Sequence, residues 1–375
     1  MAARMTKRAD GRYQYAIRFT DPITGEKDRK YFTGKTQAEV RAKVKDARER
    51  IEAGAPVKDA SRTLGDWCAQ WRESTLTASN RKDTTKALYR SLSRTHLERG
   101  PLSIIPLERL RASDVDAFIV HLQGQKKATS TIARIFHVLR MALDDAVRDG
   151  LLARNPSRLV KQPTVIKGEA RHLSSTEVKA LLLAAKDRRA HRLLTLIATL
   201  GLRKGEALAL RWDDLTLTGD HPALKVRGTL ARVNGALVIS QPKTAKSRRT
   251  LPLPASVVAL LKAQRKAQAE DRLRAGDQWR DLGHVFTTET GLPVDPSNVL
   301  REIKRAAEAA GLLDVTVHAL RHSAATSMLE SGIHLRGVSD LLGHSDIRTT
   351  AEVYGHLSDE VARTAMDGLA AAFDV

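Results

Sequence analysis

The chain has 375 residues, of which 42% are apolar, so it is long enough for two or three domains with hydrophobic cores of their own. Lysine and arginine number 63 against 43 acidic residues, giving a formal charge of +20 and a pI near 10.3, which favours a nucleic-acid partner over a merely arginine-rich soluble surface. The single cysteine, Cys68, excludes a disulfide framework and a CxxC zinc site and fits a reducing cytosol, and the lack of any run of about 18 apolar residues argues against a membrane span.

Residues 1–55 are predicted to form a small α+β unit. Residues 12–19 are rich in aromatic side chains and partly alternate, which predicts a strand. Residues 27–32 predict a second strand, which follows the turn sequence Asp-Pro-Ile-Thr-Gly. Thr36 then stands where it can cap a helix that runs from residue 37 to about residue 53.

Residues 60–160 are predicted to be entirely helical. Trp67 and Trp71 lie four residues apart, as on one face of a helix, and the apolar residues between 132 and 147 form one continuous stripe. This stripe is expected to belong to the core. The polar and basic stretch 160–172 predicts an exposed linker.

Basic side chains are spread over both of these parts. A short sheet that presents arginine and tyrosine fits a DNA groove, and basic helices fit the phosphate backbone. For any one of these side chains, an ordinary solvent-exposed basic face is about as good an explanation as contact with DNA. The candidate DNA contacts are Arg12, Arg18, Lys126, Lys127, Arg134 and Arg140.

The rest of the chain, from about residue 172, is predicted to mix helices with short strands. Ser174-x-x-Glu177 is a capping box, and the nearly all-apolar stretch 191–200 predicts a buried helix that Gly201 ends. The turn sequence Asn-Gly at 234–235 is a strong hairpin signal. The whole chain is therefore expected to be multidomain and mainly α with small β-sheets (α+β). Further expected elements are helices over about 204–210, 255–274, 298–310 and 361–373, strands over 224–226, 236–239 and 249–253, and a buried segment over 284–286.

Two clusters of basic and histidine residues and one tyrosine follow one another near the C-terminal end. His318-Ala-Leu-Arg321-His322 is the first cluster, Leu-Gly-His344 belongs to the second, and Tyr354 comes ten residues later. Arginine binds a phosphodiester with a planar fork of donors, and histidine donates a hydrogen bond or moves a proton near neutral pH. Tyrosine offers an oxygen that can attack phosphorus. The combination predicts phosphate chemistry.

Two upstream segments carry possible partners for these residues. Arg203 follows a helix-ending glycine, which suits a phosphate grip, and Glu206 is placed to hold it by an ion pair. Taken alone, an arginine beside a glutamate is a structural pair in most proteins. The second segment, residues 241–248, carries Lys243 and Lys246 on one loop between two expected strands.

Taken in order, these signals resemble the tyrosine recombinase (phage integrase) family. They are the Gly-Leu-Arg203-x-x-Glu segment, the Lys243-Thr hairpin, His-x-Leu-Arg-His, Leu-Gly-His and the downstream tyrosine. The resemblance is strongest over residues 170–360, whereas the first two parts of the chain match the family by layout only. Each signal is weak alone, but five linked signals in the family's order are highly specific.

The resemblance implies a phosphate clamp and two supporting residues. Arg203 and Arg321 would bind the non-bridging oxygens of the scissile phosphate. Glu206 and His322 would support them. Fixed cations stabilise the charge that develops on these oxygens during phosphoryl transfer, so such a clamp fits the chemistry.

The resemblance also implies the groups that move protons and attack phosphorus. His318 and His344 would bind the phosphate or shuttle protons. Lys243 would protonate the leaving 5′ oxygen, and it matches better than Lys246 because the family's lysine directly precedes the threonine. Tyr354 would be the nucleophile and would form a 3′-phosphotyrosyl link.

The family layout implies three domains. Residues 1–55 would be an arm-type DNA-binding domain, residues 60–160 a helical domain that binds the core site, and residues 172–375 the catalytic domain. The implied function is site-specific DNA recombination that integrates or excises a phage or mobile element. A type IB-like topoisomerase and a non-catalytic DNA-binding regulator are the alternatives.

The expected partners are double-stranded DNA attachment sites, a homotetramer on DNA and accessory DNA-bending or directionality factors, with no membrane. No cofactor is expected. There is no His/Asp/Glu cluster with metal-ligand spacing and no G-x-x-x-x-G-K-[ST] loop for a nucleotide. The resemblance implies a bacterial host cytoplasm, in association with the nucleoid.

Overall fold

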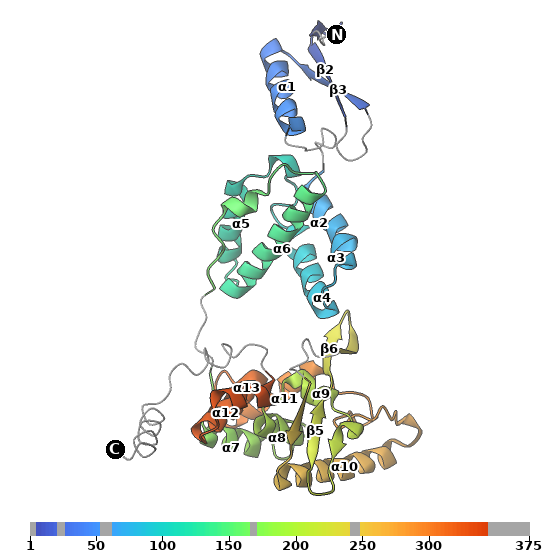
Figure 1. Ribbon diagram of the computed structural model, residues 1–375, viewed down its shortest axis with the longest axis vertical. Coiled ribbons are helices and arrows are strands. Elements are labelled where there is room, and N and C mark those ends of the chain that lie inside the picture. Colours follow the sequence, from blue (N-terminus) through green and yellow to red (C-terminus); the bar gives the residue numbers. More distant parts are fainter. Residues whose placement is uncertain (1–4, 21–26, 53–61, 166–170, 241–247, 344–375) are drawn as a thin grey trace, which may run out of the picture. The chain divides into compact units, whose positions relative to one another are not determined.

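The structure is a computed structural model that is mainly helical with small sheets, which confirms the predicted fold class (Figure 1). Contacts divide the chain into two compact units, residues 1–167 and 168–375. The residues that the structure describes are 5–20, 27–52, 62–165, 171–240 and 248–343.

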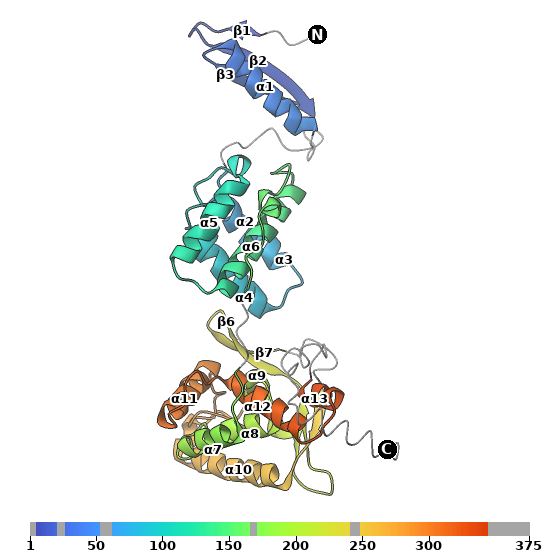
Figure 2. The same ribbon diagram turned by 90° about the vertical axis from the view of Figure 1, so that its left-hand side faces the viewer.

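The first part of unit 1 is an antiparallel sheet covered by one helix (Figure 2). The helix packs its apolar face on the sheet through Val40, Val44 and Ala47, which meet Ile17. Thr36 Oγ1 accepts a hydrogen bond from the Glu39 backbone N–H at 3.2 Å, so the predicted cap is present. The elements are β1 (Thr6–Lys7), β2 (Tyr13–Thr20), β3 (Lys27–Gly34) and α1 (Gln37–Glu52), of which only β1 was not predicted.

The second part of unit 1 is a helical bundle around a core rich in large side chains. Trp67 and Trp71 are fully buried, and each indole N–H finds a partner on α6: the Ala142 carbonyl at 2.8 Å and the Asp145 carboxylate at 2.7 Å. Cys68 is buried in the same core, and burial raises the pKa of its thiol, so it is an inert structural cysteine. The helices are α2 (Leu64–Glu73), α3 (Thr75–Ala78), α4 (Asp83–Leu92), α5 (Ala112–Gly124) and α6 (Thr129–Arg148).

Unit 2 is a second helical core that carries its own small sheets. The nearly all-apolar α8 is buried at its centre, and α7, α10 and α12 pack against it. The capping box of Ser174 is present, because Ser174 Oγ accepts from the Glu177 N–H and the Glu177 carboxylate accepts from the Ser174 N–H. The helices are α7 (Ser175–Ala184), α8 (His191–Leu200), α9 (Lys204–Ala209), α10 (Ala255–Ala275), α11 (Pro296–Ala309), α12 (Val317–Glu330) and α13 (Leu335–Leu342).

Five short strands of unit 2 form a three-stranded sheet of order β4-β5-β8 and a separate hairpin of β6 and β7. The predicted Asn-Gly turn joins β6 to β7, and the segment 284–286 is buried as expected. Two strands, β4 and β6, were not predicted. The expected tail helix, residues 361–373, lies outside the described residues. The strands are β4 (Leu215–Thr216), β5 (Ala223–Val226), β6 (Thr229–Val233), β7 (Ala236–Ser240) and β8 (Arg249–Pro252).

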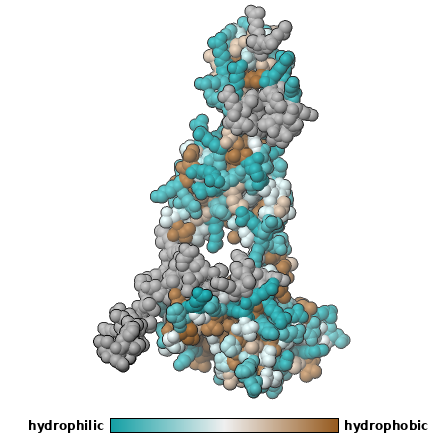
Figure 3. Space-filling model, viewed as in Figure 1, coloured by the Kyte–Doolittle hydropathy of each residue, from teal (hydrophilic) through white to brown (hydrophobic). Residues whose placement is uncertain are grey.

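The surface is polar over most of the face shown in Figure 3, with apolar side chains scattered among hydrophilic ones. None of the described helices has the length and apolar character needed to cross a membrane.

Candidate active site

The carboxylate of Glu206, buried in the first turn of α9, is the centre of the candidate site. Its Oε2 accepts a hydrogen bond from the Arg203 backbone N–H at 2.9 Å, and its Oε1 accepts one from Arg203 Nη1 at 2.7 Å. Arg203 Nη2 donates to the Gly343 carbonyl at 3.1 Å. The ion pair expected from the three-residue spacing is therefore present, and Arg203 is held at two points.

Arg321 reaches the same place from α12, more than a hundred residues later. Its side chain is buried, with Nη1 donating to the Gly201 carbonyl at 2.6 Å and Nη2 to the Leu342 carbonyl at 2.8 Å. Its Nη1 lies 4.0 Å from Glu206 Oε2. The structure thus brings Arg203, Glu206 and Arg321 together.

Gly201 allows this assembly because it sits where α8 meets α13. It adopts the left-handed conformation with φ 62°, and a Cβ there would lie 2.4 Å from Leu342 Cδ2. Any other residue would combine a strained backbone with a clash. The glycine of the Gly-Leu-Arg motif is thus explained by packing as well as by the end of a helix.

Arg249, at the start of β8, is a third arginine of the site that was not predicted. Its Nη2 lies 3.0 Å from Glu206 Oε2, and its Nε donates to the Leu341 carbonyl at 2.6 Å. A signal for it exists in the sequence. Leu251 and Leu253 are buried, so the two-residue period of a strand places Arg249 on the same inward face.

The cluster carries more positive than negative charge. Burial alone would raise the pKa of Glu206, but hydrogen bonds and charges from Arg249 and then Arg203 outweigh it, and the net pKa is lowered. The carboxylate is therefore ionised at neutral pH. With three guanidinium groups around one carboxylate, the formal charge is +2, which suits an anionic ligand.

His318 and His322 lie one helical turn apart on α12, with ring centroids 5.9 Å apart. The His318 ring reaches solvent, yet partial burial, followed by the charges of Arg321, Arg203 and Lys204, lowers its pKa. Burial and then the neighbouring His318 and Arg321 lower the pKa of His322. Both rings therefore favour the neutral form, which can accept or donate a proton.

Three predicted site residues, Lys243, His344 and Tyr354, lie outside the described residues, as does Lys246. Their neighbours in the chain lie within them. β8 begins with Arg249 shortly after the segment that carries both lysines, and α13 ends at Leu342, two residues before His344.

The predicted DNA contacts are all in unit 1. Arg12, Arg18, Lys126 and Arg134 are exposed, and Lys127 is half-buried. Arg140 is half-buried and already engaged, with its guanidinium over the Phe136 ring and Nη2 donating to the Ser157 carbonyl at 3.4 Å. Arg140 is therefore the least available of the six.

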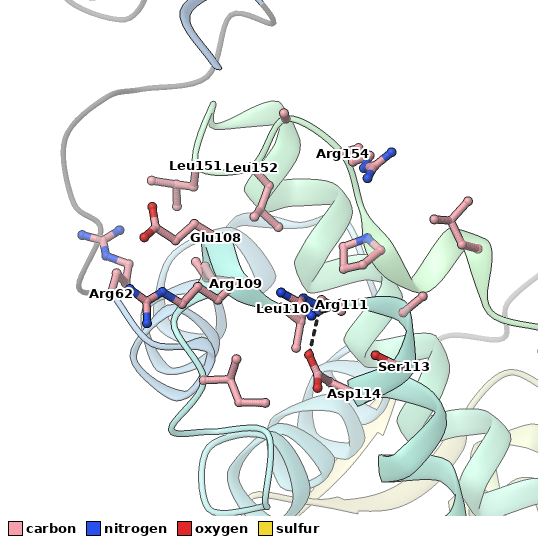
Figure 4. Close-up of a pocket in the computed structure, with 16 residues that line it drawn as sticks. Arg62, Glu108, Arg109, Leu110, Arg111, Ser113, Asp114, Leu151, Leu152 and Arg154 are labelled. Atoms are coloured by element: carbon pink, nitrogen blue, oxygen red, sulfur yellow. Dashed lines mark hydrogen bonds between the residues drawn. The ribbon is translucent and has the colours of Figure 1, made fainter. Parts of the chain in front are cut away.

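A large open cavity of unit 1, about 1080 Å³, contains none of the motif residues (Figure 4). Four arginines line it together with Glu108 and Asp114, and Asp114 accepts a hydrogen bond from the Arg111 N–H at 2.8 Å. Ser113 also lines this cavity, but none of the residues of the ordered motif pattern does. Among the described residues, no group of three or more His, Cys, Asp or Glu side chains is arranged to hold a metal ion.

Comparisons with known proteins agree with the motif pattern and with the fold described above. Residues 171–361 match the model of the phage integrase family. A tyrosine recombinase XerC-like protein of Caldanaerobacter subterraneus subsp. tengcongensis is 32% identical, over 95% of each chain. The fold resembles the Tn1549 transposon integrase in complex with transposon right end DNA (TM-score 0.66, 22% identity, 82% of this chain and 99% of that one). It also resembles a λ integrase tetramer bound to a Holliday junction (TM-score 0.60, 20% identity, 93% and 94%).

Replacing Glu206 by glutamine keeps the shape of the side chain but removes the only negative charge described in the cluster. We expect Glu206→Gln to lower the free energy of unfolding by about 3 kcal/mol, because buried guanidinium groups lose their counter-charge. Urea denaturation measures this. Since the pKa of Glu206 is lowered from 4.5, the difference from wild type should be full above pH 4.5 and should shrink as acid protonates the wild-type carboxylate.

The matched control is Glu302→Gln on α11. Glu302 also contacts two arginines, Arg188 and Arg305, but at a partly exposed position. Its loss should cost less than about 1 kcal/mol. Equal destabilisation by the two substitutions would contradict the central role of Glu206.

The two site histidines predict a second pH effect. Because folding lowers the pKa of His318 and His322 from 6.5, the unfolded chain binds more protons just below that pH. The free energy of unfolding should therefore fall as pH decreases below 6.5. NMR titration of both rings in the folded protein should give midpoints below those in urea, and higher midpoints would refute the assignment of neutral rings.

Proposed function

The chain belongs to the phage integrase family of tyrosine recombinases and is a site-specific DNA recombinase, and we propose that it breaks and rejoins DNA through a covalent bond between Tyr354 and a DNA 3′ phosphate. The observation that carries this proposal is the meeting of Arg203, Arg321 and Glu206 at the end of α13, next to the segment that leads to His344. This cluster of positive charge is anchored on Gly343, which precedes the proposed nucleophile by eleven residues in the sequence.

In this proposal Arg203 and Arg321 clamp the scissile phosphate. A guanidinium has five N–H donors, so the two side-chain bonds of Arg203 leave others for a phosphate oxygen. Binding to carboxylate and carbonyl groups fixes the plane of each guanidinium before DNA arrives. Such pre-oriented donors are typically worth roughly 3 to 4 kcal/mol each in the transition state.

The remaining steps are proton transfers around one substitution at phosphorus. The phenolic oxygen of Tyr354 forms a bond to phosphorus as the bond from phosphorus to the 5′ oxygen breaks. Lys243 gives a proton to that 5′ oxygen. The phenol proton passes to a neutral histidine, and the lowered pKa of His318 supports its role as acceptor. His344 hydrogen-bonds the phosphate, and His322 supports its neighbour.

Rejoining reverses these steps with a new DNA strand. The 5′ hydroxyl of the incoming strand attacks phosphorus and the tyrosine leaves, so the bond energy stays in the phosphotyrosine link. This accounts for exchange without a nucleotide cofactor, and the chemistry requires no metal because the clamp is already cationic.

We propose that the three parts of the chain share the work of binding DNA. Residues 1–55 form an arm-type domain, residues 60–160 bind the core site, and residues 172–375 catalyse. The separate buried clusters around Val40 and around Trp67 support distinct domains within unit 1. The proposed contacts to phosphates are the exposed or half-buried basic side chains Arg12, Arg18, Lys126, Lys127 and Arg134, with Arg140 in a lesser role.

The proposed partners are double-stranded attachment sites and three further copies of the chain. Exchange between two duplexes cuts four strands, which calls for four active sites. The likeness to a λ integrase tetramer bound to a Holliday junction supports this arrangement. Accessory DNA-bending or directionality factors belong to the same proposal, as does action on the nucleoid in a bacterial cytoplasm.

Replacing the nucleophile tests the chemistry. On a nicked duplex from the DNA that flanks the coding sequence, wild-type protein should form an adduct that survives denaturation. Tyr354→Phe should bind the same DNA but form no adduct, because the attacking oxygen is gone. Sequencing the DNA end of the wild-type adduct maps the cleavage site.

The matched control is Tyr89→Phe, which removes the nearest upstream tyrosine oxygen, on α4. It should form the adduct as wild type does. An adduct with Tyr354→Phe would reject the assignment of the nucleophile. Efficient relaxation of a plasmid without attachment sites would instead favour a topoisomerase.

A further inference from the structure

Three arginines bind three successive carbonyl groups at the end of α13. Arg249 Nε lies 2.6 Å from the Leu341 oxygen, Arg321 Nη2 lies 2.8 Å from the Leu342 oxygen, and Arg203 Nη2 lies 3.1 Å from the Gly343 oxygen. The last carbonyls of a helix lack partners within the helix and carry its negative dipole end. The arginines satisfy these groups, and the helix end in turn orients the arginines.

Arg249 is as buried as Arg321, with 6% of its side chain exposed against 4%, whereas Arg203 is 36% exposed. All three guanidinium nitrogens of Arg249 donate to protein acceptors, with Nη1 3.3 Å from Glu206 Oε1. Its guanidinium is used inside the protein, with Nη2 on the Glu206 carboxylate and Nε on the Leu341 carbonyl. A planar fork can bind both acceptors at once, which a lysine ammonium cannot do in the same geometry.

The end of α13 leaves room for this arginine. Gly343 adopts a left-handed conformation with φ 67°, and a Cβ there would lie 2.9 Å from Arg249 Nη1. The glycine of the Leu-Gly-His motif therefore serves both the helix end and the close approach of a guanidinium from β8.

Arg203 and Arg249 share one acceptor, the Glu206 carboxylate, and bind different carbonyls at the end of α13. Its own side-chain partners are Glu206 Oε1 and the carbonyl of Gly343, and Arg249 ties Glu206 to the neighbouring carbonyl of Leu341. Removing Arg249 would loosen both supports of Arg203 together. Displacement of a catalytic group by about 1 Å can cost on the order of 100-fold in rate.

We propose that Arg249 is a positioning residue for strand cleavage, which aims Arg203 at the scissile phosphate by locking Glu206 to the end of α13. This inference rests on the proposed role of Arg203 as a phosphate clamp. Arg249 itself does not contact DNA, so its loss changes the rate of cleavage and not the affinity for the site.

The test compares two DNA substrates that differ only in charge at the mapped cleavage position. One carries the normal phosphodiester, and in the other a methyl group replaces one non-bridging oxygen and makes that linkage neutral. Arg249→Lys should slow scission of the normal DNA about 10- to 100-fold. On the neutral DNA it should stay within about threefold of wild type, because there is no phosphate charge left for a well-aimed arginine to stabilise. The Kd for normal DNA should be unchanged within about threefold.

Arg189→Lys is the matched control. Arg189 is built like Arg249, with Nη2 on the buried Asp271 carboxylate at 2.5 Å and Nε on the Thr287 carbonyl at 3.0 Å, but it lies outside the cluster. Its replacement should leave scission of both substrates within about threefold of wild type.

Arg249 is only a structural residue if Arg249→Lys slows both substrates equally or slows neither, and either result overturns the inference. Failure of the wild-type protein to form any adduct would instead reject the proposed function. If thermal melting shows that Arg249→Lys does not fold, Gly343→Ala carries the same test, because its added methyl group would lie 2.9 Å from Arg249 Nη1 and displace that guanidinium.

Discussion

The site depends on the buried carboxylate of Glu206. This single negative charge lies among three guanidinium groups, so the cluster keeps a net positive charge. Glu206 binds Arg203 and Arg249 directly and lies near Arg321. Burying unpaired guanidinium groups would be costly, so the excess charge needs the helix carbonyls as further acceptors. What remains is a fixed cluster with net positive charge, and the proposed ligand, a phosphodiester, would lower its electrostatic cost.

This charge balance explains why distant segments meet. The end of α13 is the common acceptor for arginines from the α8–α9 junction, from β8 and from α12. Gly201 and Gly343 supply the close approaches that the junction requires. In the sequence, His344 directly follows this helix end, so the segment that carries the proposed nucleophile begins where the proposed phosphate clamp is held.

The sequence was sufficient to predict the helices and residue pairs that depend on local periodicity or on motifs in a fixed order. Helix α6 follows from its apolar stripe and α7 from its capping box, and the Arg203–Glu206 pair follows from a spacing of three residues. Arg249 was missed because its partners, Glu206 and Leu341, lie 43 and 92 residues away; the two-residue period of β8 indicates an inward-facing side chain but does not identify those partners. Strand β4 was missed because it has only two residues, whereas β6 is as long as the predicted β7 and was missed because pairing with a neighbour, more than the side-chain pattern, determines it.

The most direct test of the central claim is an experimental structure of the Tyr354→Phe protein on its mapped attachment-site DNA. The account predicts that Arg203 and Arg321, still anchored to Glu206 and to the end of α13, both donate hydrogen bonds of roughly 2.7 to 3.2 Å to non-bridging oxygens of one phosphate. A phosphate at the cleavage position that is bound elsewhere, with both guanidinium groups still occupied only by protein acceptors, would contradict it.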